Sequence, residues 1–165
     1  MMNKKQYTCC FTGHRKIAPE QQPAVIGRLK KTVEQLIVDG YCYFGTGGAL
    51  GFDTLAAQCV LSFKKQYPHI RLILVLPCLE QSKHWPAQDV AVFENIKASA
   101  DKVVCLSDRY TRDCMFKRNR YLVDHSRVCV AYLTHPWGGT AYTVEYARRK
   151  GVQVIDLAEY FPVNL

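Results

Sequence analysis

The sequence predicts an α/β fold, a doubly wound three-layer α/β/α sandwich in which a mainly parallel sheet lies between helices. Two observations predict it. Apolar, β-prone runs alternate along the chain with segments of helical periodicity, an order typical of parallel sheets. The most apolar run, residues 70–76, has almost no polar alternation, as expected for a strand covered on both sheet faces. The length of 165 residues fits one domain, so residues 1–165 are assigned to a single unit.

The first strand is predicted at residues 7–12, a short β-prone run. A helix follows near Pro19 and Pro23, because apolar side chains then recur at helical spacing. Its apolar face would carry Val25, Ile26, Leu29, Val33, Leu36 and Ile37. Asp39-Gly40 is predicted to end this helix.

The second strand is predicted at residues 41–44, immediately before the glycine-rich segment 45–51. Residues 52–63 then show helical periodicity, and residues 70–76 form the third strand. The remaining elements follow the same alternation. They are a loop at 77–86, a helix at 88–98, a strand at 102–106, a polar helix at 113–125, a strand at 128–133, a turn at 134–138 leading into a helix that ends at Gly151, and a strand at 152–156.

Composition narrows the class of protein. With 48% hydrophobic and 22% charged residues, the chain is not of a disordered type. It has no apolar stretch long enough for a membrane span and no signal-peptide pattern, so no membrane association and a cytoplasmic location are expected. The formal net charge of +8 favours anionic partners without saying which kind.

The eight cysteines are interpreted as reduced thiols packed in the core. No two of them have the CxxC spacing of a zinc site, and their density is below that of disulfide scaffolds. No metal site is therefore predicted, and no cofactor is firmly implied.

Glycine-containing turns follow several predicted strands. They lie at residues 12–15, 45–53 and 138–140, and the last two lead into helices. Ligands of parallel α/β folds bind at the carboxyl ends of the strands, where glycine lets the backbone approach an anion and helix-start amides donate hydrogen bonds. The turns and the arginines of Arg118-Asn119-Arg120 together predict a phosphate site.

Each of these residues also has a structural alternative that remains open at this point. The glycines serve equally well in tight turns, and neither the dinucleotide fingerprint nor a P-loop is present. Asp53 either contacts a ligand hydroxyl or complements the helix dipole. His14 either touches the ligand or orders its loop. Trp85 either stacks on a base or anchors the packing of the 77–86 loop.

The ordered set of motifs resembles the YpsA-like family of the Rossmann-like SLOG superfamily, which also includes the DNA-processing protein A (DprA/Smf) and LOG phosphoribohydrolase families. The match spans about residues 7–156. It rests on Thr12-Gly13-His14-Arg15, Gly47-Gly48-Ala49-Leu50-Gly51-Phe52-Asp53, Arg118-Asn119-Arg120 with Ser126, and Gly139-Thr140 with Thr143, Ala147 and Gly151, together with Pro77, Gln81 and Trp85.

Two departures separate the chain from the related families. Leu50 stands where DprA has an arginine in its glycine loop, and the extra domains of DprA are absent from this sequence. Thr143 stands where LOG enzymes have a glutamate, while Glu145 would face elsewhere on the helix.

The primary hypothesis is a protein that binds a nucleotide or nucleotide-derived ligand, either a nucleoside phosphate or an ADP-ribose-like molecule. The alternatives are a phosphoribohydrolase or N-glycosidase, with Asp53 as a weak catalytic candidate, and a DprA-like binder of single-stranded DNA, which ranks last. A homodimer is left open. The residues predicted to bind the ligand are Thr12, Gly13, His14, Arg15, Thr46, Gly47, Gly48, Gly51, Asp53, Pro77, Trp85, Arg118, Asn119, Gly138, Gly139 and Thr140.

Overall fold

The fold is built on one six-stranded sheet in which every neighbouring pair of strands is parallel. A computed structural model describes residues 3–160, and the sheet order is β4-β3-β2-β1-β5-β6. The strands are β1 (Thr8–Gly13), β2 (Tyr43–Thr46), β3 (Arg71–Leu76), β4 (Lys102–Cys105), β5 (Val128–Tyr132) and β6 (Gln153–Asp156). The parallel α/β fold that the sequence predicts is confirmed.

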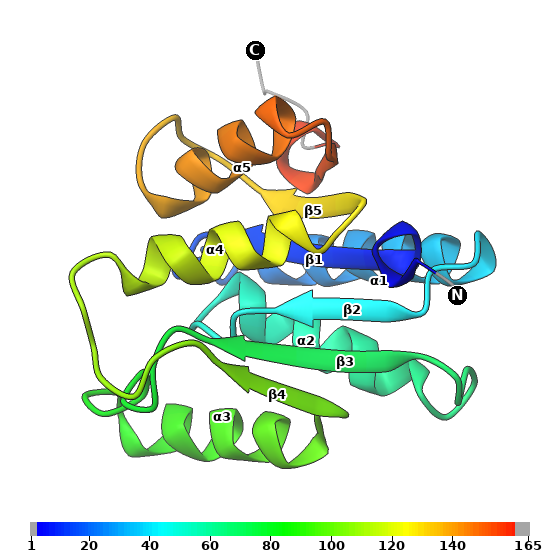
Figure 1. The fold of residues 1–165 in the computed structure, drawn as a ribbon. Helices are drawn as coiled ribbons and strands as arrows, with labels where there is room; N and C mark the ends of the chain where they lie inside the picture. Colours follow the sequence, from blue (N-terminus) through cyan, green and yellow to red (C-terminus); the bar gives the residue numbers. More distant parts are fainter. Residues whose placement is uncertain (1–2, 161–165) are drawn as a thin grey trace.

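Helices cover both faces of the sheet (Figure 1). The helices are α1 (Gln22–Val38), α2 (Phe52–Phe63), α3 (Ala87–Ser99), α4 (Cys114–Asp124) and α5 (Gly139–Arg149), with short 3-10 turns η1 (Lys4–Tyr7) and η2 (Leu157–Tyr160). The first three helices connect strands that advance in one direction across the sheet. Right-handed crossovers therefore place them on one face, and the return through α4 and α5 places those helices on the other.

Two large apolar clusters pack these layers together, and a small third one lies between β3 and α3. On one face, side chains of α1 and α2 such as Leu29 and Phe52 bury Phe11 and Phe44 of the sheet. On the other face, Leu122 of α4 packs with its neighbours against Val75 and other strand side chains. All eight cysteines are free, and most of them are buried.

The sheet reverses its order between β1 and β5, and this reversal positions the site. The two strands are paired from Cys9 to Gly13, with Gly13 opposite Tyr132 at their carboxyl ends. Beyond these residues the chain runs to α1 on one face and to α5 on the other. The loops therefore diverge and leave a crevice at the switch point, the usual place for a ligand in this architecture.

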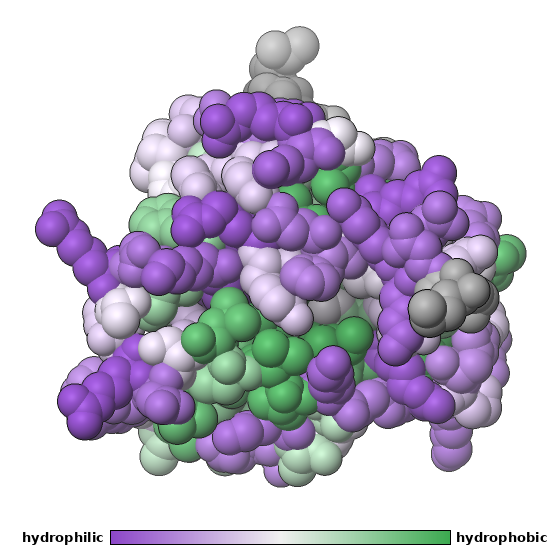
Figure 2. All heavy atoms as spheres, viewed as in Figure 1, coloured by the Kyte–Doolittle hydropathy of each residue, from purple (hydrophilic) through white to green (hydrophobic). Residues whose placement is uncertain are grey.

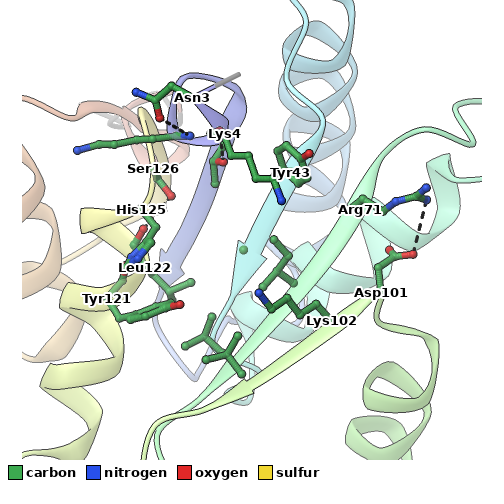
Figure 3. A pocket seen from close by; sticks show the side chains of 16 residues that line it. Asn3, Lys4, Tyr43, Arg71, Asp101, Lys102, Tyr121, Leu122, His125 and Ser126 are labelled. Atoms are coloured by element: carbon green, nitrogen blue, oxygen red, sulfur yellow. Dashed lines mark hydrogen bonds and ion pairs between the residues drawn. The ribbon is translucent and has the colours of Figure 1, made fainter. Parts of the chain in front are cut away.

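The second face of the sheet is only partly covered. Helices α4 and α5 lie over β1, β5 and β6, while β3 and β4 leave apolar side chains facing a groove of about 580 Å³ beside α4. Figure 2 shows this apolar surface at the centre of the view. Figure 3 shows Lys4, Arg71 and Lys102 at its border, near the amino ends of the strands.

None of the helices within residues 3–160 is both long enough and apolar enough to cross a membrane.

Candidate functional site

A cavity of about 330 Å³ lies at the switch point, between the end of β1 and the starts of α4 and α5. It brings together more than half of the residues that the sequence predicts for a ligand site. These are Thr12, Gly13, His14, Arg15, Asp53, Arg118, Asn119, Gly139 and Thr140. The volume falls at the lower end of the range for small-molecule sites.

The start of α5 is the part of this cavity best suited to an anion. Gly138 precedes the helix with a φ of 92°, and no side chain caps the first turn, which also contains no acidic residue. The first backbone hydrogen bond of the helix runs from Tyr142 N to Gly138 O. The amides before Tyr142 therefore have no helical acceptor. A Cβ at Gly139 would meet nothing within 4 Å, and Gly139 is exposed and lines the cavity, so this end of the helix is accessible.

Arg15 contributes a cation to the same cavity. Its side chain is exposed and lines the cavity, with Nη2 at 4.0 Å from the sulfur of Met115. The exposed guanidinium and the uncapped helix amides line one cavity, and both favour an anion there.

Arg118 has a different environment, because the residue is only 4% exposed. Nη1 donates to the carbonyl oxygen of Gly47 at 2.6 Å and to Oε1 of Gln81 at 3.0 Å, and Nε donates to Oδ1 of Asn119 at 2.8 Å. Burial lowers the pKa of this guanidinium, while the charge of Asp53 acts in the opposite direction. Arg118 therefore holds the glycine loop in place through the carbonyl oxygen of Gly47, and it also lines the cavity.

Asp53 forms a buried carboxyl group at the floor of the cavity. Its Oδ2 accepts a hydrogen bond from the amide of Ala49 at 3.2 Å. Burial raises the pKa of the carboxyl from 3.8 to about 6, and the nearby charge of Arg118 only partly offsets this effect. The group therefore changes charge near neutral pH, which suits either a proton donor or a hydrogen-bond partner of a ligand.

The glycines of the second loop are explained by packing. A side chain at Gly47 would overlap the guanidinium of Arg118, and one at Gly51 would overlap the backbone of Arg15. Gly48 has a φ of 68° and lies against Leu74, where a Cβ would come within 2.8 Å. None of the three is among the cavity-lining residues.

The remaining predicted residues lie near the cavity or away from it. Thr46 is buried and its hydroxyl donates to the carbonyl oxygen of Asp53 at 3.4 Å. Pro77 is buried after β3 and does not line the cavity. Trp85 packs edge-on against Phe93 with a centroid separation of 5.4 Å, beside the β3–α3 cluster. Its position matches the packing alternative.

Some residues around the cavity are absent from the sequence prediction. Phe11, Ala49 and Met115 complete the lining. Met115 could have been predicted, because it lies three residues before Arg118 in a predicted helix and must share its face. Phe11 and Ala49 are apolar neighbours of predicted motifs, and apolar side chains alone do not indicate a ligand.

An aromatic stack beside the cavity is also missing from the prediction. The His14 ring stacks on His135 at 3.8 Å between centroids, and His135 contacts the Trp137 ring at 4.3 Å. The backbone N–H of Thr134 donates to Nε2 of His14 at 2.9 Å, which requires a neutral ring with its hydrogen on Nδ1. His14 thus orders two loops and lines the cavity as well.

Comparison with known sequences places the chain among bacterial relatives. The family model YpsA, described as the YspA SLOG family, matches residues 10–155. The SPbeta prophage-derived protein YoqJ of Bacillus subtilis is 33% identical over 135 residues, covering 74% of this chain and 79% of that protein. A UPF0398 protein of Bacillus cereus is 29% identical over 143 residues, covering 82% and 77%.

Solved structures agree on the fold. DNA processing protein A from Helicobacter pylori, whose structure is described with a single-stranded DNA binding mode, superposes with a TM-score of 0.65 at 16% identity, covering 91% of this chain and 64% of that one. The Streptococcus pneumoniae protein gives 0.64 at 18%, covering 92% of this chain and half of the other. With the family model matching nearly the whole sheet and every loop of the cavity, the chain belongs to the YpsA SLOG family.

Proposed function

We propose that the protein binds a nucleotide-derived ligand, a nucleoside phosphate or an ADP-ribose-like molecule, in the cavity at the switch point. The observation that carries the proposal is the start of α5. Its first turn has no side-chain cap and no acidic residue, and Gly139 is exposed, lines the cavity and has nothing within 4 Å of an added Cβ. A phosphate there would accept hydrogen bonds from the amides and face the cation of Arg15.

Gly139→Asp tests this site, because it should change binding and stability in opposite directions. A carboxylate in the first turn favours the helix dipole by about 0.3–1 kcal/mol. The same carboxylate would repel a phosphate and occupy its place. We expect the melting temperature to stay or rise while calorimetric affinity for AMP falls at least roughly tenfold, which corresponds to about 1.4 kcal/mol.

Gln88→Asp is the matched control, since it adds the same charge to the exposed first turn of α3, away from the cavity. It should leave AMP affinity unchanged. If the Gly139→Asp protein binds AMP as tightly as wild type, the phosphate is not at α5 and the proposal is wrong.

A phosphoribohydrolase is a second candidate, favoured by the buried Asp53 carboxyl with a pKa of about 6 in the cavity wall. Such a group could protonate a leaving base in the neutral range. Release of free base from nucleoside monophosphates, lost in Asp53→Asn, would support it. If the nucleoside monophosphates bind but none of them is hydrolysed, the protein is a binder and not a hydrolase.

Binding of single-stranded DNA is the third candidate, favoured by the fold shared with DNA processing protein A. Leu50 weighs against it, as does the cavity volume of about 330 Å³, which suits one nucleotide better than a strand. Fluorescence anisotropy with a short oligodeoxyadenylate would detect it.

A further inference from the structure

A row of aromatic rings runs from the core to the surface beside the cavity. Phe52 stacks on Tyr132 at 5.9 Å, Tyr132 meets His14 edge-on at 6.3 Å, and His14 and His135 stack at 3.8 Å with an angle of 13°. Trp137 completes the row at 4.3 Å from His135. Phe52 and Tyr132 are buried, whereas Trp137 is 67% exposed.

The outer end of this row lies next to the open amides of α5. Trp137 precedes Gly139 by two residues, so their Cα atoms are at most about 7 Å apart. His14 and Gly139 both line the cavity. A ribose can bridge the distance between a phosphate at the first turn of α5 and a base on Trp137.

Trp137 is an unusual residue to leave in solvent. A tryptophan is normally buried for most of its surface. Within residues 3–160, Trp137 has one ring contact, with His135, and two-thirds of its surface remains exposed. The His14 ring beneath is fixed by the Thr134 amide at 2.9 Å, so the platform is preorganised.

We propose that Trp137, supported from below by His135 and His14, is the stacking platform for the nucleobase of the ligand. The inference rests on the proposed function and makes it more specific, because it requires a planar aromatic base in addition to a phosphate. Stacking of this kind tolerates any base, so the ligand class is a purine or pyrimidine nucleotide rather than a sugar phosphate.

The test uses the full chain with Trp85→Phe, which leaves Trp137 as the single tryptophan. This protein is titrated with AMP and with ribose 5-phosphate while Trp137 fluorescence is recorded. We expect AMP to quench the fluorescence and to bind roughly tenfold or more tightly than ribose 5-phosphate, the size of effect typical of one stacked base.

Trp137→Ala, followed by calorimetry, should lower AMP affinity to that of ribose 5-phosphate and leave ribose 5-phosphate affinity unchanged. Tyr110→Ala is the control, since Tyr110 is similarly exposed at 62% but is not part of the aromatic row formed by His14, His135 and Trp137. It should change neither affinity.

The outcomes separate this inference from the proposed function. Equal binding of AMP and ribose 5-phosphate, with or without Trp137, overturns the platform and leaves the phosphate site standing. Binding of neither compound, nor of a short oligodeoxyadenylate, overturns both. Quenching by the oligodeoxyadenylate alone supports the platform and assigns the base to a nucleic-acid strand.

Discussion

Two arginines at the same cavity have different physical roles. Arg118 is 4% exposed and its donors are committed to Gly47, Gln81 and Asn119, whereas Arg15 is exposed at the rim. Sequence motifs cannot separate these roles, because burial depends on where α4 meets the glycine loop. We therefore propose that the phosphate is contacted by Arg15 and not by Arg118.

Substitution of the two arginines should separate stability from binding. Arg118→Met keeps a side chain of similar length but leaves buried acceptors without donors, so we expect the free energy of unfolding to fall by about 3 kcal/mol or more. Arg15→Ala should change it by less than about 0.5 kcal/mol and weaken AMP binding roughly tenfold. Urea unfolding and calorimetry measure the two effects. Equal stability losses would contradict the assignment.

The buried Asp53 carboxyl should make stability depend on pH. Its folded pKa of about 6 lies above the ordinary 3.8. Between these values the folded chain binds more protons than the unfolded chain, so stability falls as pH rises from about 4 to about 6 and is then level. The pKa difference corresponds to roughly 3 kcal/mol.

Asp53→Asn should remove this fall, while the exposed Asp108→Asn should retain it. Denaturant unfolding of the three proteins at a series of pH values measures the difference. An identical pH dependence in wild type and Asp53→Asn would show that the carboxyl ionises as freely in the folded chain as in the unfolded one.

At the scale of elements, the first turn of α2 lies on the end of β1. A side chain at Gly13 would overlap the ring of Phe52, which begins α2. Gly13→Ala should therefore force the two elements apart and cost about 1–3 kcal/mol of unfolding free energy.

Gly27→Ala is the matched change, because Gly27 lies inside α1 with nothing within 4 Å of an added Cβ. It should stabilise the protein by about 0.5–1 kcal/mol. Thermal unfolding of both variants shows whether Gly13→Ala lowers the stability and Gly27→Ala raises it. A neutral Gly13→Ala would mean that the contact between β1 and α2 is loose.

Most elements could be predicted from periodicity, and the exceptions have local causes. The second strand is predicted at 41–44 but is Tyr43–Thr46, because Gly45 looks like the start of a turn. In the fold, Gly45 belongs to the strand and lies under α4, where a Cβ would come within 3.0 Å of Leu122. Tyr7, predicted as strand, ends the 3-10 turn η1.

At the scale of the whole molecule, the order of the strands in the sheet could not be predicted from the sequence. The order depends on which edges pair, and only this pairing places the loop after β1 beside the loop after β5. The glycine-containing loop motifs could be found one by one. The stack of His14 on His135 could not, since it joins residues 121 positions apart in the chain.

The net charge of +8 makes salt dependence a test of ligand size. Some of the cations, such as Lys4, Arg71 and Lys102, border the groove on the open sheet face and lie away from the cavity. A mononucleotide should therefore lose affinity with a slope of about −1 against the logarithm of salt concentration, and a strand should show a several-fold steeper slope. Titrations over a range of salt concentrations distinguish them. A steep slope for AMP would contradict a single phosphate contact at α5.

The most direct test is a crystal structure of the protein with AMP. We expect the phosphate within hydrogen-bond distance of the Gly139 and Thr140 amides, near Arg15, with the adenine ring against Trp137. A phosphate bound instead among Lys4, Arg71 and Lys102 in the groove of Figure 3 would contradict this expectation and move the functional site to the open face of the sheet.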